Sequence, residues 1–288
     1  MGYWFVSLAS DSSFVMGFRK NKGTMLKIAL TLHTEKLDAD NVWYQVEGML
    51  SFLQKRHIPA SFFCTAPTHA YYRNQPYFSE TKWINRINQL AQQGHSIQQH
   101  THFYAPDGTK TGDFTLMNVE KRLTEDYEWL QRQKFTPTGF VGGGWTINLD
   151  IVRFLARYNY RYDCSARTFS LDYLKDRDQA LQIQQPCLFN FQDYALLELP
   201  TSTSVATFMK SLYPFSGAKI YVDVPHSEPY ALIYLHDYDL LNPKFRIALR
   251  VALSWYYRRG CKFLTTDELA DIVSRGELSY QVLDDSRC

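Results

Sequence analysis

The sequence predicts an α/β fold in which helices cover a parallel sheet or barrel. Short apolar runs of strand length alternate with amphipathic segments along most of the chain, which is typical of strand–helix units. The length of 288 residues fits one large α/β domain or two smaller ones. No linker, internal repeat or low-complexity stretch interrupts the sequence. We therefore expect a single domain over residues 25–280.

Eight short apolar runs predict the strands. The first reads KIALTL, a continuous apolar run bounded by polar residues, and the second follows Pro59. The fourth leads directly into three glycines. In chain order the strands are expected at residues 27–32, 60–63, 96–99, 139–141, 160–165, 196–199, 231–235 and 262–264.

Amphipathic segments with recognisable ends predict the helices. Asn242 precedes Pro243, the usual order of a capping residue and a first-turn proline. Thr265 and Glu268 have the spacing of a capping box. The helices are expected after Asp40 and Asn41, over 81–93, 115–133 and 150–158, from Pro243 to Gly260, and from Thr265 to near Gly276.

Two segments do not follow the alternation. Residues 1–24 are expected to be an N-terminal extension or an added first strand. Residues 166–195 show no clear periodicity, and we expect them to form an insertion over one face of the domain.

The composition excludes several classes of partner and location. Lys and Arg number 31 against 29 for Asp and Glu, so a net charge of +2 gives no electrostatic reason to expect nucleic acid or an anionic membrane. No transmembrane segment is predicted, and the first 19 residues do not resemble a secretory signal. Five scattered cysteines without a Cys-x-x-Cys pair favour a reducing compartment, so we expect a cytoplasmic protein.

Histidines and one carboxylate follow several predicted strands. His33 and Glu35 come after the first strand, His100 and His102 after the third, and His236 after the seventh. The carboxyl ends of parallel strands meet at one end of the fold, where the chemistry of such folds is located. Because side chains alternate along an extended chain, residues two apart point to the same side. These side chains are therefore expected to converge.

Imidazoles with one carboxylate suit zinc or a similar divalent metal. Two histidines and a carboxylate leave open positions for water and substrate, which is the catalytic arrangement. The alternative for any single histidine is a structural role. We expect that role for His95, after Gly94, and surface or loop positions for the other three, His57, His69 and His226.

At these positions the sequence resembles the polysaccharide deacetylases, the NodB-type proteins of carbohydrate esterase family 4. The branch from bacterial capsule and surface-sugar gene clusters is the most similar. Residues 31–35 read Thr-Leu-His-Thr-Glu where that branch has Thr-Phe-Asp-Thr-Glu. Residues 94–102 read Gly-His-Ser-Ile-Gln-Gln-His-Thr-His against Gly-His-Glu-Ile-x-x-His-x-His. Further similar segments lie at residues 140–145, 160–165, 198–200, 235–236 and 262–265.

The resemblance implies a distorted (β/α) barrel, often seven-stranded, and metal-assisted hydrolysis of an N-acyl group on an amino sugar. It implies that Glu35, His100 and His102 hold a divalent metal, most simply Zn²⁺, and that His236 donates a proton to the leaving amine. The implied partner is an N-acetylated or N-formylated sugar or glycan precursor. Cleft-lining positions are expected at Tyr104, Gly143, Gly144, Trp145 and Asp237.

Two residues depart from the family pattern. His33 stands where the family has its base Asp, and Val141 where it has an Arg that pairs with that Asp. The family more often has its second histidine at the position of Tyr104. Because an Arg beside a histidine would leave a buried cation unpaired, the two departures fit each other physically.

Three interpretations of these departures follow. In the first, the site is altered but functional, with His33 as general base or as a further nitrogen ligand. In the second, the chain is a catalytically inactive deacetylase relative that binds carbohydrate. A structural barrel without a ligand is the third, and it leaves the strand-end histidines without a reason.

Overall fold

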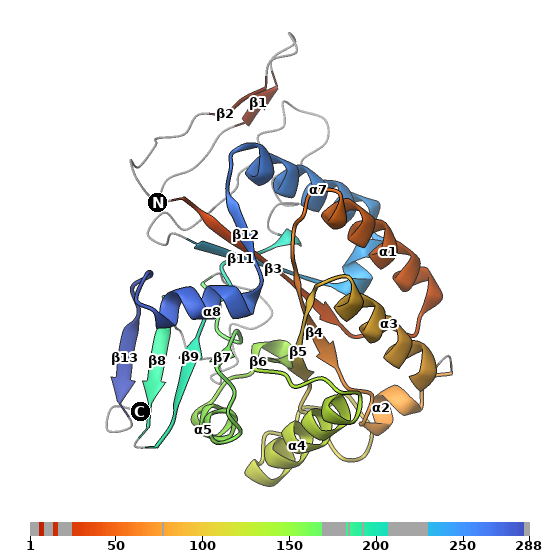
Figure 1. The fold of residues 1–288 in the computed structure, drawn as a ribbon. Coiled ribbons are helices and arrows are strands. Elements are labelled where there is room, and N and C mark those ends of the chain that lie inside the picture. The colour runs from red at the N-terminus through yellow and green to blue at the C-terminus, as the bar shows by residue number, and fades with distance from the viewer. Residues whose placement is uncertain are drawn as a thin grey trace.

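The computed structural model describes residues 6–8, 14–16, 25–76, 78–168, 183, 185–191, 193–206 and 230–284. These residues form an α/β structure in which one large curled sheet is surrounded by helices (Figure 1). Along the described residues, no helix combines the length and the apolar character needed to cross a membrane. The α/β fold class predicted from the sequence is confirmed.

The sheet is an open half-barrel with parallel strands at its centre. Seven strands pair consecutively and in parallel in the order β11-β3-β4-β5-β6-β7-β9. Their bounds are β11 Tyr230–His236, β3 Lys27–Thr34, β4 Ser61–Thr65, β5 Ser96–Thr101, β6 Gly139–Gly142, β7 Tyr162–Asp163 and β9 Ala195–Glu198. The curled, mainly parallel arrangement is that of a distorted (β/α) barrel, as the resemblance implies.

Four further strands bring the sheet to eleven. The strand β12 (Lys262–Leu264) pairs with the first residues of β3, and β10 (Thr203–Ser204) pairs with β11. At the other edge, β8 (Cys187–Asn190) is antiparallel to β9 and parallel to β13 (Gln281–Asp284). The sequence did not predict β8, β10 or β13, since runs of two to four residues at a sheet edge have no clear periodicity.

Because β8 belongs to the sheet, part of the expected insertion over 166–195 is instead an edge of the fold. Residues 169–182, 184 and 192 of that segment lie outside the described part of the chain. In the expected N-terminal extension, β1 (Val6–Leu8) and β2 (Phe14–Met16) pair with each other in a separate antiparallel sheet. The domain boundary at residue 25 stays a prediction.

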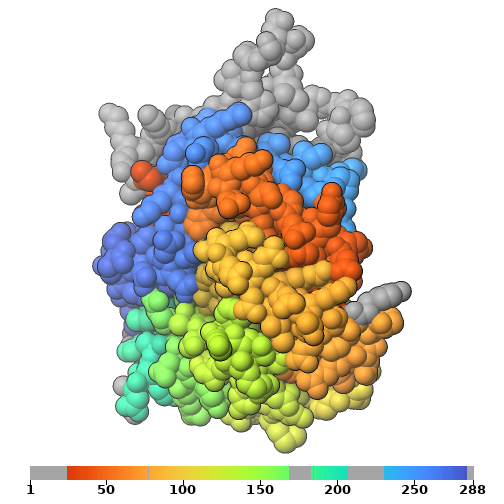
Figure 2. Space-filling model, turned by 45° about the vertical axis from the view of Figure 1, so that its right-hand side comes forward, coloured from red at the N-terminus to blue at the C-terminus, as the bar shows by residue number. Residues whose placement is uncertain are grey.

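The helices lie outside the half-barrel, and all but the short α2, which was not predicted, begin and end within a few residues of the predicted positions. In the space-filling view, α1, α3 and α4 follow one another down one face in chain order (Figure 2). The bounds are α1 Asp40–Gln54, α2 Ala70–Arg73, α3 Glu80–Gln92, α4 Leu116–Arg132, α5 Leu149–Arg157, α7 Pro243–Arg258 and α8 Thr266–Ser274, with short 3-10 turns at η1 Gly143–Trp145 and η3 Asp237–Leu241.

Strand β3 is buried on both faces, as expected for a central parallel strand. Ile28, Leu30 and Leu32 belong to the large core that also includes residues of α1, α3 and α7. Ala29, on the opposite face, belongs to a second core with Phe63 and residues of α8. The strand therefore has little freedom to move, and the residues that follow it are held in place.

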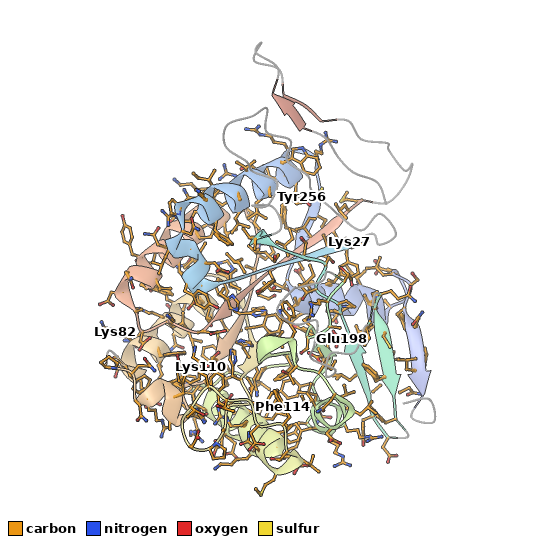
Figure 3. The ribbon with its side chains drawn as sticks, turned by 180° about the vertical axis from the view of Figure 1, so that it is seen from behind. Lys27, Lys82, Lys110, Phe114, Glu198 and Tyr256 are labelled. Carbon is orange, nitrogen blue, oxygen red and sulfur yellow. The ribbon has the colours of Figure 1, made fainter. Side chains whose placement is uncertain are left out.

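A buried pair of carboxyl groups lies where β7 and β9 end. Asp163 and Glu198 are register partners, and both are completely buried. Figure 3 shows Glu198 within the outline of the fold, whereas Lys82 lies at its margin. Asp163 Oδ1 accepts hydrogen bonds from Ser165, and Glu198 Oε1 accepts one from the Ala166 amide, 2.9 Å away.

The second oxygen of each carboxyl is left without a donor. Among the described residues, neither Asp163 Oδ2 nor Glu198 Oε2 has a hydrogen-bond partner. Burial raises the pKa of Asp163 to about 6. Burial is the largest cause that raises the pKa of Glu198 well above its usual value, and the charge of Asp163 is the second. One proton shared by the pair would satisfy both groups.

This pair predicts a stability that falls as the pH rises. Folding raises the carboxyl pKa values above their unfolded values of about 4, so the folded state binds protons more tightly. The stabilisation is complete below about pH 4 and is lost as the pH rises through about 6, the raised pKa of Asp163. Glu198→Gln keeps the shape and supplies an N–H donor, so thermal unfolding from pH 4.5 to 8.5 should show a higher Tm at alkaline pH and a flatter profile.

The matched control is Glu128→Gln, which removes an exposed carboxylate paired with Arg132. This variant should keep the wild-type pH profile. A Glu198→Gln profile parallel to that of the wild type would show that the buried pair is not the source of the pH dependence.

Candidate metal centre

The strand ends bring the predicted histidines and Glu35 together. Strands β3 and β11 are neighbours whose register ends with the pair His33 and His236. Glu35 follows β3 by one residue, and His100 lies in β5, with His102 one residue beyond it. Convergence of these five side chains was expected from strand periodicity, and the structure has it.

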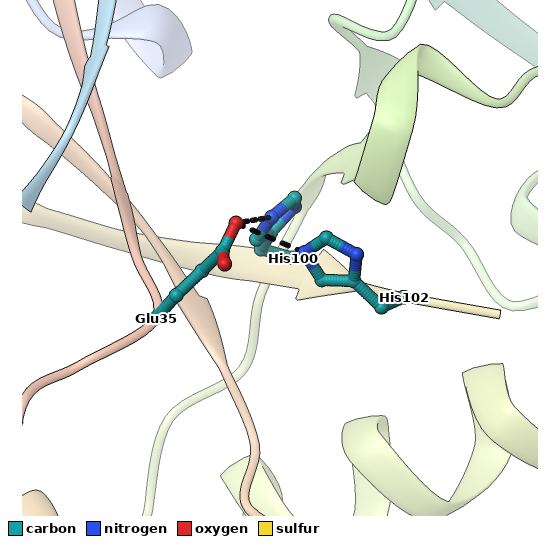
Figure 4. A group of neighbouring side chains, drawn as sticks. All are labelled: Glu35, His100 and His102. Carbon is teal, nitrogen blue, oxygen red and sulfur yellow. Dashed lines mark hydrogen bonds and ion pairs between the residues drawn. The ribbon is translucent and has the colours of Figure 1, made fainter. Parts of the chain in front are cut away.

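A single oxygen atom of Glu35 is the centre of the cluster. Glu35 Oε1 lies 3.0 Å from His102 Nε2, 3.4 Å from His100 Nε2 and 3.4 Å from His236 Nε2. Figure 4 shows Glu35 facing His100 and His102 across a short gap. The ligand atoms of these three residues all lie within 4.8 Å of one another. A carboxylate and two imidazoles at this spacing can hold one metal ion.

The tautomer of the neutral His100 ring is set by its second nitrogen. Nδ1 lies 2.9 Å from the carbonyl oxygen of Val141. A carbonyl oxygen only accepts, so Nδ1 carries the proton and donates it. In the neutral ring the lone pair of Nε2 then faces the Glu35 carboxylate. Two acceptors facing each other need a cation between them, and the donor set therefore fits a metal ion.

His102 can occupy its position only because residue 143 is glycine. A Cβ atom built on Gly143 would overlap the ring of His102. On its other side His102 is stacked on Tyr104, with ring centroids 4.8 Å apart and planes at 23°. The imidazole is therefore clamped between the backbone of η1 and an aromatic ring.

His33 lies beneath the cluster among aromatic rings. It is 4% exposed, and its ring centroid is 4.8 Å from that of His100 and 5.6 Å from that of His236. Three further rings surround it, those of Phe63, Trp145 and Tyr234. Burial, then the charges of His100 and His236, lower its pKa well below the usual value. His33 is therefore neutral at physiological pH.

The charges of Glu35 and His236 are balanced by different neighbours. Burial opposes ionisation of Glu35, but the surrounding imidazoles, led by His102, hold its pKa well below the usual range. Burial also opposes charge on His236, yet the hydrogen bond to Asp239 and the nearby carboxylates outweigh it and raise the pKa. His236 is thus the ring of the cluster that is best able to carry and give a proton.

Three of the predicted cleft residues, Tyr104, Gly143 and Trp145, lie beside histidines of the cluster. Gly144 and Trp145 both have positive φ angles, 66° and 61°, and this turn directs the Trp145 indole against Tyr234, with ring centroids 4.6 Å apart. Trp145 and Tyr104 are 5% and 8% exposed, so both are mainly packed. Their contact with a substrate stays a prediction.

Asp237 contacts the backbone of the loop that carries Glu35. It is completely buried, and its Oδ2 accepts from the backbone amides of Glu35 and Lys36, while Oδ1 accepts from the amide of Tyr238. No exposed oxygen is left on it. Its expected contact with substrate stays a prediction. In the structure, its carboxyl group supports the loop that carries Glu35.

The histidines outside the cluster have structural positions. His95 Nδ1 accepts from the Ala60 amide at 3.2 Å, as expected for a turn residue. His69 was expected at the surface or in a loop, and it lies buried in the turn before α2, which it caps by accepting from the Tyr71 amide. His57 is exposed beyond α1, and His226 lies outside the described residues.

Sequence reasoning missed three contributors to the site. Asp239 contacts both the amide and the ring of His236, and its signal is the His-x-x-Asp spacing. Tyr234 lies two residues before His236, so strand periodicity could have found it. The carbonyl of Val141 has no signal in the side-chain sequence.

No family model and no curated protein matches this sequence. Among solved structures, the chain is similar to a provisionally assigned polysaccharide deacetylase from Mycobacterium smegmatis, with 17% identity, a TM-score of 0.62 and coverage of 92% of this chain and 96% of that one. A family 4 acetyl xylan esterase from Clostridium thermocellum, solved with a cobalt ion, has 15% identity, a TM-score of 0.48 and coverage of 87% and 92%.

A 4-α-glucanotransferase from Thermococcus litoralis has 9% identity and a TM-score of 0.51, covering 88% of this chain and 39% of that one. At these identities the similarity concerns the fold. The fold expected from the motif resemblance, that of the polysaccharide deacetylases, is confirmed.

The Gly143 contact predicts the effect of adding one methyl group. Gly143→Ala should displace the His102 ring and lower the free energy of unfolding by about 1–3 kcal/mol, since overpacking strains a buried site. Urea unfolding and the imidazole NMR signals of His102 would measure both effects. Gly48→Ala is the control, because the nearest atom to its added methyl is Arg250 Nη2 at 3.8 Å. Wild-type stability with an unshifted His102 signal would contradict the prediction.

Proposed function

We propose that this chain, which shares its fold with the polysaccharide deacetylases, is a metal-dependent hydrolase that removes an N-acyl group from an amino sugar. The observation that carries the proposal is the contact of one Glu35 oxygen with the Nε2 atoms of His100 and His102. These residues would hold the metal, and a zinc ion suits two imidazoles and one carboxylate. When bound, such an ion supplies Lewis acidity toward an acyl carbonyl.

The fit of the three ligands depends on their surroundings. Glu35 is held ionised by the neighbouring imidazoles, and His100 is oriented by the Val141 carbonyl. Burial, the largest cause, lowers the pKa of His102. A carboxylate and two neutral imidazoles are the forms in which these groups bind metals.

His33 and His236 are suited to opposite proton transfers. We assign His33 the role of general base, because its lowered pKa keeps a lone pair free. Among the described residues, the group at ligand distance comprises Glu35, His100 and His102 and does not include His33, which favours a base over a further ligand. His236, with its raised pKa and its contact to Asp239, would protonate the leaving amine.

The surroundings support a sugar as the substrate. The ring of Tyr238, which is half-buried, is stacked on His236, and aromatic faces stack on the apolar faces of sugars. The partner we propose is an N-acetylated or N-formylated sugar or glycan precursor. The described cysteines Cys64, Cys164, Cys187 and Cys261 are free, which supports a reducing, cytoplasmic location.

Metal analysis tests the proposed centre. Purified protein should contain about one equivalent of zinc, and Glu35→Gln, His100→Ala and His102→Ala should each weaken zinc binding at least ~10-fold, as expected for the loss of a ligand. His57→Ala changes an exposed histidine far along the chain and should bind zinc as the wild type does. Release of acetate from N-acetylhexosamine substrates should fall in parallel with metal content.

Wild-type protein without metal, and without rescue by added zinc, would instead favour an inactive relative that binds carbohydrate. Isothermal titration with N-acetylated oligosaccharides would then be the measurement that detects its ligand.

Removing the His33 ring separates its two expected roles. His33→Ala should lower kcat by about 10²- to 10⁴-fold, the usual contribution of a general base, while zinc content stays near that of the wild type. Loss of zinc together with activity would make His33 a ligand. Unchanged turnover with unchanged zinc content would exclude both roles.

A further inference from the structure

We propose that Asp237 is a positioning residue that fixes Glu35 against the histidines through the backbone of the loop after β3. The proposal rests on the metal-binding role of Glu35 proposed above. Asp237 does not reach the cluster with its own side chain. It acts on the two amides next to the ligand, and its effect on the metal is therefore indirect.

The contacts of Asp237 use both oxygens of its carboxylate. Oδ2 accepts from the amide of Glu35 at 3.1 Å and from the amide of Lys36 at 2.8 Å. Oδ1 accepts from the amide of Tyr238 at 2.8 Å. The side chain is 0% exposed, so water cannot replace these bonds. A carboxylate is well matched to three converging N–H donors, because it offers acceptors only.

The position of Asp237 explains why the loop needs this support. The main-chain pairing between β3 and β11 ends with His33 and His236. Glu35 lies two residues beyond that last pair. Asp237 is the first residue after this pair on the β11 side. Its side chain continues the hydrogen bonding between the two segments beyond the end of the strands. It thereby ties Glu35 to the strand that carries His236, whose Nε2 lies 3.4 Å from Glu35 Oε1.

A ligand must be held within a fraction of an ångström to bind a metal tightly. Asn at position 237 keeps the shape but replaces one acceptor oxygen by an N–H₂ donor. The N–H₂ group of Asn would then point at a backbone N–H, and two donors cannot form a hydrogen bond with each other. We expect the loop to loosen in Asp237→Asn and to loosen further in Asp237→Ala.

The matched control is Asp267→Asn. Asp267 accepts from Ser96, Gln98 and Thr138, which lie at the starts of β5 and β6 and therefore at the opposite end of the sheet from Glu35. Its replacement removes a carboxylate with several partners without touching the cluster. Both Asp237→Asn and Asp267→Asn should therefore lower the stability of the fold. Only Asp237→Asn should also loosen the position of Glu35.

Amide hydrogen exchange of the metal-free protein tests the positioning directly. The amides of Glu35 and Lys36 should exchange at least ~10-fold faster in Asp237→Asn than in the wild type, and should be unchanged in Asp267→Asn. In the same variants, zinc affinity should fall at least ~10-fold, and kcat should fall more than KM rises, for Asp237→Asn only. The absorption spectrum of the cobalt-loaded protein should shift in that variant.

Unchanged exchange at Glu35 and Lys36 in Asp237→Asn would overturn the proposal, as would loosened amides with wild-type zinc affinity. Wild-type protein that binds no zinc would refute the proposed function, while the exchange data would still decide whether Asp237 holds the loop. If Asp237→Ala does not fold, the milder Asn variant decides alone.

Discussion

The parallel register of β3 and its neighbours is the constraint on which the rest of the site depends. Because β3 and β11 end level with each other, with His33 paired to His236, their next residues meet at one place. Strand β5 brings His100 to the same end of the sheet. The cluster is thus produced by the alignment of strand ends, and a slip of one residue would turn Glu35 away from the imidazoles.

Position 141 shows how a site can change its chemistry without losing its geometry. The carbonyl of Val141 orients His100, and this contact is independent of the side chain. The side chain itself is free to be apolar, and it packs in the core that contains Phe63. A buried neutral imidazole at position 33 needs no cation beside it. The two departures from the deacetylase pattern are therefore compatible with an intact cluster of Glu35 and the histidines.

The features that depend on the side-chain pattern of long strands were predictable from the sequence. The run from Lys27 and the strand-end histidines follow from apolar patterning and from the period of two, and both describe the structure well. The role of Asp237 was not predictable, because its partners are backbone amides of a loop distant in sequence. The edge strands β8 and β13 were missed because their pairing depends on neighbours and not on their own periodicity.

Two strands, β4 and β12, pair with the same edge of β3, and this has a consequence for folding. Residues 27–29 pair with β12 and residues 31–34 with β4 along that edge, while β11 covers the other. The partners β11 and β12 begin more than 200 residues after β3. The central strand is therefore synthesised early and completed last, which implies a high contact order and slow folding. Until β11 and β12 emerge, this central strand is an open template for mispairing, and the same strand arrangement aligns Glu35 with the histidines.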